Sequence, residues 1–255
     1  MLRPRRATAP FASRSRRKPG VRRARSEPQA NEGTTVDVYE ALYTTRAMRR
    51  VKPDPIPLSV QQRILDAAIR APSGGNAQMW RFLLLDDPAQ KARLGPIYRG
   101  CLGQLWETIY KPRADAAART PDAPESREFV KMQRSASWLA DHFESYPLFL
   151  FAFSQFDTTG SSIYPAVWSA MLAARAEGVG SALTSVFMFR IGEVLEVLGV
   201  PKDQGWNFNG CVSFGYPTGR WRVAPRTPVH GVSFRNHWGQ PVGFQIDAPL
   251  WSAER

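Results

Sequence analysis

The stretch Pro72-Ser-Gly-Gly-Asn-Ala-Gln-Met-Trp80 carries the most specific pattern in this chain of 255 residues. Its proline ends a helical pattern over residues 59–71, and its tryptophan begins an apolar run. Ser73 and the two glycines let backbone N–H groups approach a ligand, while Asn76 and Gln78 offer amide donors and acceptors. An ordinary helix-to-strand connector needs no such amide pair. The stretch therefore predicts a binding loop.

The pattern on either side of this loop predicts intermixed helices and strands. Short apolar runs are typical of buried strands over residues 80–85, 148–153, 182–187 and 209–214. Helical spacing predicts helices over residues 38–46, 59–71, 90–110, 126–144, 163–177 and 190–198, the third broken near Gly95-Pro96. Residues 111–125 are polar and are expected to form a mobile loop. The mixture favours one α+β domain over a doubly wound sheet.

The first helix is predicted from a capping box, because Asp37 is followed three residues later by Glu40. Its apolar residues Val38, Leu42 and Tyr43 are expected to face inward. Similarly, Ser59 is expected to cap the second helix.

Three arginines stand close together in Thr44-Thr-Arg-Ala-Met-Arg-Arg50, which we expect at the end of the first helix. None of Arg46, Arg49 and Arg50 has an obvious acidic partner within four residues downstream, because Asp54, four residues after Arg50, follows a proline. Guanidinium groups match phosphate oxygens bidentately, so a ligand phosphate would satisfy them. A solvated basic helix end is the plainer alternative. A weaker signal of the same kind is Arg226, whose position between prolines restricts its backbone.

Most of the net charge of +12 lies near the N-terminus, where residues 1–35 contribute +8 and residues 36–255 only +4. The first segment is rich in Arg, Pro and Ser and predicts a disordered basic tail ahead of a domain over residues 36–255. A solvated tail without a dedicated role is the simplest interpretation. A nucleic-acid or anionic-surface arm, an organellar presequence and a start site placed too far upstream are the alternatives.

Several classes of chemistry are excluded by what the sequence lacks. It has no P-loop, dinucleotide-binding or nucleophile-elbow motif, and its three histidines lack metal-ligand spacing. Cys101 and Cys211 are too few for a disulfide framework, which favours a reducing compartment. No apolar run approaches the ~20 residues that span a bilayer. We therefore expect a soluble, cytoplasmic protein with no metal and no catalytic side chain, whose chemistry comes from a cofactor.

In this order and at these separations, the segments resemble the nitroreductase family of FMN-dependent oxidoreductases over about residues 37–240. The string 72–80 is the most specific match. The arginine string, Gly178-Val-Gly-Ser181 and the turn that begins Gly215-Tyr-Pro, followed by a late Arg-x-Pro, complete the pattern. Residues 136–140 and 164–168 resemble the branch with a longer middle insertion. The resemblance implies a central, mainly antiparallel sheet flanked by helices, in an intertwined homodimer with a C-terminal extension over residues 229–255.

The resemblance also implies two FMN sites at the dimer interface. Arginines would bind the phosphate and ribityl side: Arg46, Arg49, Arg50 and Arg226. The partner subunit would contribute the loop residues Pro72, Ser73, Gly74 and Asn76, with Gln78 near the ring. The flavin's central ring would lie against Leu183, Thr184 and Ser185. Two residues depart from the family, because a serine is common where Ala47 stands and a proline where Met79 stands.

The function implied is an FMN-dependent oxidoreductase that passes electrons from NAD(P)H to an electron-poor acceptor, such as a nitroaromatic or a quinone, by a ping-pong mechanism. A guanidinium near the ring would stabilise the negative charge of the reduced flavin. The alternative is a flavin-binding protein that stores FMN or uses it for another reaction, such as reductive dehalogenation or flavin turnover. NADH, NADPH and a deazaflavin are all compatible with the sequence. A nucleic-acid-binding module is disfavoured, because the domain carries little net charge.

Overall fold

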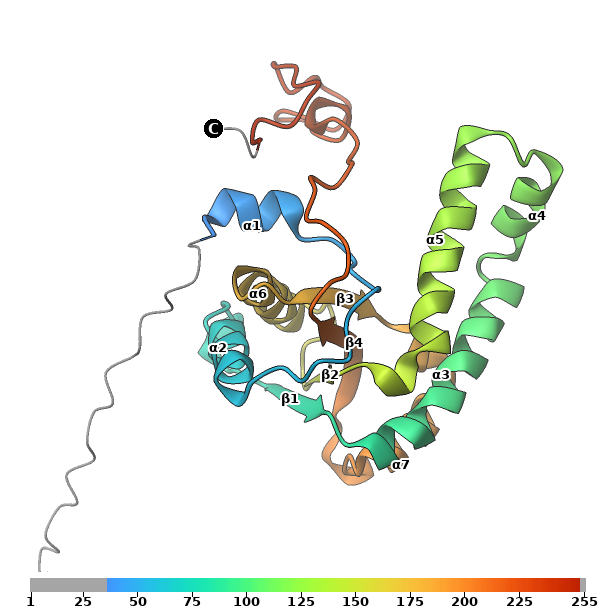
Figure 1. Ribbon diagram of the computed structural model, residues 1–255. Coiled ribbons are helices and arrows are strands. Elements are labelled where there is room, and N and C mark those ends of the chain that lie inside the picture. The colour runs from blue at the N-terminus through green and yellow to red at the C-terminus, as the bar shows by residue number, and fades with distance from the viewer. Residues whose placement is uncertain (1–35, 253–255) are drawn as a thin grey trace, which may run out of the picture. The chain divides into compact units, whose positions relative to one another are not determined.

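A computed structural model describes residues 36–252. The tail expected over residues 1–35 lies outside the described residues. The described helices are α1 (Val38–Thr44), α2 (Leu58–Ala68), α3 (Pro88–Glu107), α4 (Lys111–Arg119), α5 (Pro124–Asp141), α6 (Ile163–Ala176) and α7 (Ile191–Leu198) (Figure 1). The strands are β1 (Trp80–Leu85), β2 (Leu148–Ser154), β3 (Gly180–Thr184) and β4 (Asn207–Gly215).

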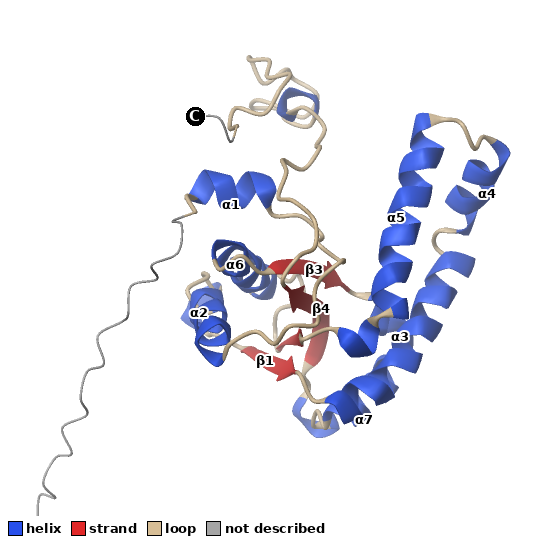
Figure 2. Ribbon diagram, viewed as in Figure 1, coloured by secondary structure: helices blue, strands red, loops and turns tan. Residues whose placement is uncertain are grey.

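The four strands form one antiparallel sheet in the order β1-β2-β4-β3 (Figure 2). All four strands predicted from apolar runs are present, within three residues at each end. Strand β2 lies in the centre and every one of its residues is buried. This explains why it reads as a continuous apolar run rather than an alternating one. The α+β prediction with a mainly antiparallel sheet is confirmed.

Helices cover both faces of the sheet. The even-numbered apolar residues of β2 pack in one cluster with α2 and α6, and its odd-numbered phenylalanines pack in a second cluster with α3, α5 and α7. Side chains of a strand point alternately to opposite faces, so β2 contributes to both clusters. The sheet is therefore the rigid centre on which the loops at its edges are mounted.

The N-terminal ends of the first two helices were predicted with mixed success. Asp37 caps α1 as expected, because its Oδ1 accepts a hydrogen bond from the Glu40 N–H at 2.9 Å. The predicted inward face was wrong for two of its three residues, because Val38 is 62% exposed and Leu42 41% exposed, whereas Tyr43 is half-buried. Helix α1 is held instead by polar contacts, because Arg175 donates to Glu40 at 2.6 Å and to Thr44 Oγ1 at 2.8 Å. Helix α2 begins after Pro57 with no side-chain cap, so the expected Ser59 cap was also wrong.

The middle of the chain is more helical than predicted. Helix α3 continues through Pro96, although a proline within a helix removes one hydrogen bond and its ring crowds the carbonyl four residues earlier. Helix α4 occupies most of the segment expected as a mobile loop. Its alanines favour a helix, Pro112 fits the first turn, and Lys111 pairs with Asp115 one turn later. Helices α4 and α5 then form a hairpin beside α3 (Figure 1).

Across residues 36–252, none of the helices combines the length and apolar character that crossing a membrane requires.

Candidate functional site

The three arginines at 46, 49 and 50 do not lie on a helix. Helix α1 ends at Thr44, and the backbone is extended from Thr45 onward. The Met48 N–H donates to the Ser181 carbonyl of β3 at 2.9 Å, and the Lys52 N–H donates to the Tyr216 carbonyl at 2.8 Å. The prediction that the three arginines lie at the end of the first helix was therefore wrong. We call residues 46–50 the arginine segment; it lies along the outer edge of β3.

Two glycines allow this segment to approach the sheet. A Cβ atom on Gly180 would lie 2.8 Å from the Met48 Cβ, and one on Gly215 would lie 2.6 Å from Val51 Cγ2. Both separations are shorter than carbon atoms tolerate, so any side chain at either glycine would push the segment away. Gly180 and Gly215 are the glycines in two of the sequence strings singled out above. Their role here is close packing of one backbone on another.

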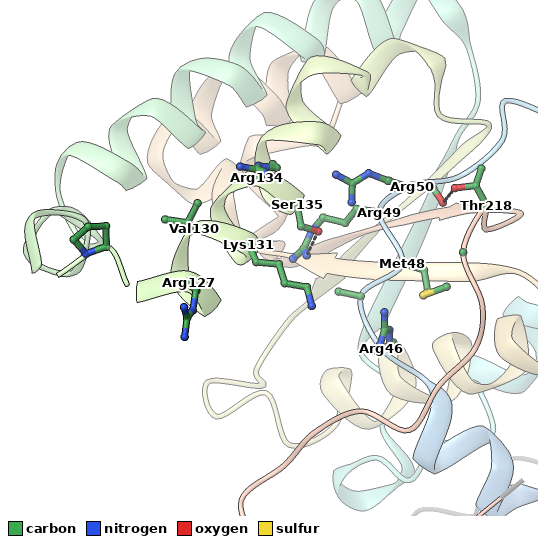
Figure 3. A pocket seen from close by; sticks show the side chains of 13 residues that line it. Arg46, Met48, Arg49, Arg50, Arg127, Val130, Lys131, Arg134, Ser135 and Thr218 are labelled. Atoms are coloured by element: carbon green, nitrogen blue, oxygen red, sulfur yellow. Dashed lines mark hydrogen bonds between the residues drawn. The ribbon is translucent and has the colours of Figure 1, made fainter. Parts of the chain in front are cut away.

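The arginine segment forms one wall of a cleft of about 700 Å³, which we call the arginine cleft (Figure 3). The opposite wall is α5, whose side chain Ser135 accepts a hydrogen bond from Arg49 Nη1 at 3.4 Å. Other lining residues come from the turn after β4 and from the α4–α5 connection. The lining residues are Arg46, Ala47, Met48, Arg49, Arg50, Pro121, Arg127, Val130, Lys131, Arg134, Ser135, Thr218 and Gly219.

The arginine cleft is strongly positive. Six of its lining residues are cations, and no Asp or Glu of the described chain lines it. Within residues 36–252, none of the six forms an ion pair with a carboxylate. Arg50 lies over the ring of Trp138 at 5.0 Å, which orients its guanidinium without neutralising it. A cleft with this lining is suited to phosphate or carboxylate oxygens.

A second cleft, of about 630 Å³, adjoins the first at Arg49, which lines both. We call it the aromatic cleft, because its walls include Tyr98, Trp106, Tyr110 and Phe189. Its remaining lining residues are Leu102, Leu105, Ile109, Met132, Ala136, Leu183, Thr184, Ser185, Val186 and Met188. The structure thus brings two predicted groups together, the arginine segment and residues 183–185.

Hydrogen bonds fix the polar end of the aromatic cleft. The Tyr98 hydroxyl donates to Thr184 Oγ1 at 3.5 Å, and the Val186 N–H donates to the same oxygen at 3.3 Å. Burial raises the pKa of Tyr98 to about 12, so the phenol stays protonated and remains a donor. With its oxygen accepting twice, the Thr184 hydroxyl can direct its own proton elsewhere.

The loop at residues 72–78 lies at the other edge of the sheet, ahead of β1. Asn76 and Gln78 both have a positive φ, 54° and 51°, an uncommon conformation for residues other than glycine. Gln78 Nε2 donates to Asn76 Oδ1 at 3.0 Å, and the Gln78 N–H donates to Ser73 Oγ at 3.2 Å. Pro72 and Gly74 are exposed. Within one chain, none of the loop's residues lines the arginine or the aromatic cleft.

Arg226 lies in a third groove, formed with Tyr43 and residues 246–250 of the C-terminal segment. Its Nη1 donates to the Pro225 carbonyl at 2.8 Å, and its side chain is exposed. It does not line the arginine cleft of its own chain.

Sequence reasoning missed the α5 wall of the arginine cleft. Arg127, Lys131 and Arg134 are spaced four and three residues apart, the separation that places helical side chains on one face. That spacing was visible within the predicted helix 126–144. The turn residues Thr218 and Gly219 were missed too, because only the three-dimensional fold brings them beside the arginine segment.

The sequence profile described as the Nitroreductase family matches residues 42–216, more than half of the chain. This protein belongs to the nitroreductase family. The sheet, the covering helices and both clefts lie mainly within the matched range, so the fold is that of the family.

Curated proteins with similar sequences have different names. Iodotyrosine deiodinase of Thermotoga neapolitana is 28% identical over 194 residues, which cover 75% of this chain and 95% of that protein. NADH dehydrogenase of Thermus thermophilus is 42% identical over only 59 residues, so the match spans 23% of this chain and 29% of that protein.

A solved structure with similar features is that of oxidised iodotyrosine deiodinase bound to FMN and 3-iodo-L-tyrosine. It is 27% identical, superposes with a TM-score of 0.56, and covers 74% of this chain and 94% of its own.

Proposed function

We propose that this protein is an FMN-dependent oxidoreductase that passes electrons from NAD(P)H to an electron-poor small molecule, such as a nitroaromatic or a quinone. The observation that carries the proposal is the pair of clefts joined at Arg49. One is lined by cations without carboxylate partners and the other by aromatic side chains. Together they suit a ligand with a phosphate at one end and a flat ring at the other. The similarity to the deiodinase structure, which is bound to FMN, also supports FMN as the ligand.

The residues of the chain fit FMN in character. The phosphate would lie against Arg46, Arg49 and Arg50, whose guanidinium forks match its oxygens. Ala47 supplies no hydroxyl, so the arginines carry the phosphate contacts of the segment. The ring would lie against residues 183–185, where the Thr184 hydroxyl is oriented by Tyr98. When bound, FMN supplies the two-electron chemistry that the side chains lack.

The proposed site needs a second copy of the chain. The loop 72–78 and the arginine segment lie at opposite edges of one sheet, so they can meet only between two subunits. Large apolar side chains stand exposed on the C-terminal segment: Val232, Phe234, Trp238, Phe244 and Leu250. Phe156 is 90% exposed and lines a small cleft with Ser73 and Gln78. Such surfaces mark an interface, which supports a homodimer with FMN between the subunits.

Reductive dehalogenation of an aromatic compound is the second candidate. The match to iodotyrosine deiodinase along 95% of that protein favours it, as does an aromatic cleft large enough for a substituted ring. Both candidates use the same cofactor and the same clefts, and they differ in the acceptor.

The test is to purify the protein aerobically, record its absorbance, and add NADH or NADPH under anaerobic conditions. We expect a yellow preparation whose flavin band bleaches and returns when a nitroaromatic or quinone is added. Return of the band only with an iodinated or brominated phenol, with halide release, would favour dehalogenation. A colourless protein that takes up no added FMN would overturn both candidates.

A further inference from the structure

Helix α5 carries a row of three cations along one side, which we call the α5 row. Arg127, Lys131 and Arg134 all line the arginine cleft, and all are exposed. In Figure 3, Lys131 extends from α5 towards the arginine segment on the opposite wall. The row is therefore a second basic wall, supplied by a different element from the first.

The charge of the two walls exceeds what one FMN phosphate requires. A phosphate monoester carries about two negative charges at neutral pH, and the arginine segment already presents three guanidinium groups. The α5 row raises the total to six cations in a cleft with no acidic lining residue among those described. Like charges facing one another repel, and an anion placed between them relieves that repulsion. The α5 row thus has capacity for an anion beyond the flavin phosphate.

The geometry limits where this second anion lies. Met132 and Ala136, which are neighbours of the row on α5, line the aromatic cleft. Helix α5 therefore lines the arginine cleft with its cations and the aromatic cleft with two apolar side chains. A molecule whose ring occupies the aromatic cleft can place an acidic group against the row.

We propose that the α5 row binds a second anionic group, a carboxylate or a phosphate, on the small molecule that reacts with the flavin. The inference rests on the proposed function, because that function places the molecule beside the flavin. The same oxygen chemistry could come from either reactant. An acidic aromatic acceptor would bring a carboxylate, and NADPH would bring a phosphate that NADH lacks.

The first experiment measures binding without turnover. Benzoate and its neutral counterpart benzamide are titrated into the purified protein by calorimetry. We expect benzoate to bind more tightly, and the triple variant R127Q/K131Q/R134Q to weaken benzoate binding about tenfold with little effect on benzamide, since solvent screens the charges of these exposed side chains but leaves part of each charge-assisted contact. Calorimetry needs no flavin signal, so the measurement stands even if the protein takes up no FMN and the proposed function fails.

The second experiment separates the two sources of the anion by half-reaction. Oxidation of the reduced protein is followed with 4-nitrobenzoate and with its neutral methyl ester. Reduction is followed with NADPH and with NADH. If the acceptor carries the anion, the triple variant lowers the acid-to-ester rate ratio about tenfold; if the reductant carries it, the NADPH-to-NADH ratio falls instead. Either change in ratio supports the proposal.

The matched control is Arg119→Gln, on the neighbouring helix α4. Arg119 is an exposed cation of the same hairpin that lines neither cleft, and it should leave both ratios at their original values. Three results of the triple variant would overturn the proposal. They are loss of FMN comparable to that of an arginine-segment variant, dissociation of the dimer in sedimentation, and unchanged values of benzoate binding and of both rate ratios.

Discussion

The arginine segment and the loop 72–78 are mounted on opposite edges of the same sheet, and they differ in how complete they are. The arginine segment has a facing wall in its own chain, donates to the backbone of β3 and encloses a cleft. The loop bonds mainly to itself, holds Asn76 and Gln78 at a positive φ, and stands exposed. Strain of this kind persists where function or a partner requires it. In the site that we propose, one chain therefore supplies a cleft with both walls at one edge of its sheet and an exposed loop at the other edge.

The largest expected effect comes from removing the charges of the arginine segment. The triple variant R46Q/R49Q/R50Q should weaken FMN binding at least a hundredfold, because three charge-assisted contacts worth about 1.5–3 kcal/mol each are lost, even after screening. Thermal unfolding should change little, since none of the three pairs with a carboxylate of the described chain. The dissociation constant is measured by flavin fluorescence. Arg70→Gln, an exposed residue in the turn just after α2, is the control, and equal retention in both variants would refute the phosphate assignment.

The second prediction compares one glycine that packs against the arginine segment with one glycine of the loop 72–78. Gly180→Ala should lower stability by about 1–3 kcal/mol and weaken FMN binding, because its new Cβ would meet Met48 at 2.8 Å. Gly74→Ala meets nothing within 4 Å in one chain and should leave the melting temperature of the dissociated chain unchanged. Calorimetry and FMN titration of both variants test this. If Gly74→Ala weakens FMN binding without altering stability, a ligand approaches the loop closely; if it leaves FMN binding intact, the loop does not contact the cofactor.

The third prediction concerns Arg226, which within one chain lies neither in the arginine cleft nor in the loop 72–78. If it reaches the phosphate in the assembled protein, Arg226→Ala should weaken FMN retention about tenfold, the loss expected for one charge-assisted contact. The fold should persist, since the side chain bonds only to the Pro225 carbonyl. Gel filtration in dilute FMN, with Arg222→Ala as the neighbouring control, measures retention. Parental retention would remove Arg226 from the site.

The smallest effect concerns Tyr98 in the aromatic cleft. Its pKa is raised by burial to about 12 in the folded protein, whereas a free phenol titrates near 10. The stabilisation from keeping this phenol neutral is complete below about pH 10 and is lost as the pH rises towards 12. The free energy of unfolding should therefore fall across that window, and Tyr98→Phe should flatten the slope by about 1 kcal/mol per pH unit. Denaturant unfolding at several pH values tests this, and an unchanged slope would contradict the assignment.

The sheet could be predicted from sequence because its signals are local. Each strand is a short apolar run, and β2 is buried on both faces, so its pattern has no polar interruption. The same holds for the Asp37 cap, where one side chain bonds to a backbone group three residues away.

The errors arose where distant contacts decide the structure. Arg175 on α6 holds α1 from outside the helix, which let Val38 and Leu42 remain exposed. The arginine segment is extended because β3 offers it a hydrogen-bonding edge, and no pattern within residues 44–50 records that. The α5 wall is an intermediate case, because its spacing was visible but its position opposite the arginine segment was not.

The attachment of the arginine segment to β3 has a consequence for aggregation. A strand at the edge of a sheet exposes unpaired backbone groups to any other strand that approaches. Here the Met48 N–H takes one carbonyl of β3, Ala47 forms a bridge to Ser181, and the same few residues place positive charges along that edge. A second sheet approaching β3 would meet both occupied backbone groups and repelling guanidinium groups. The segment that we assign to holding an anion thus also protects the open side of the sheet.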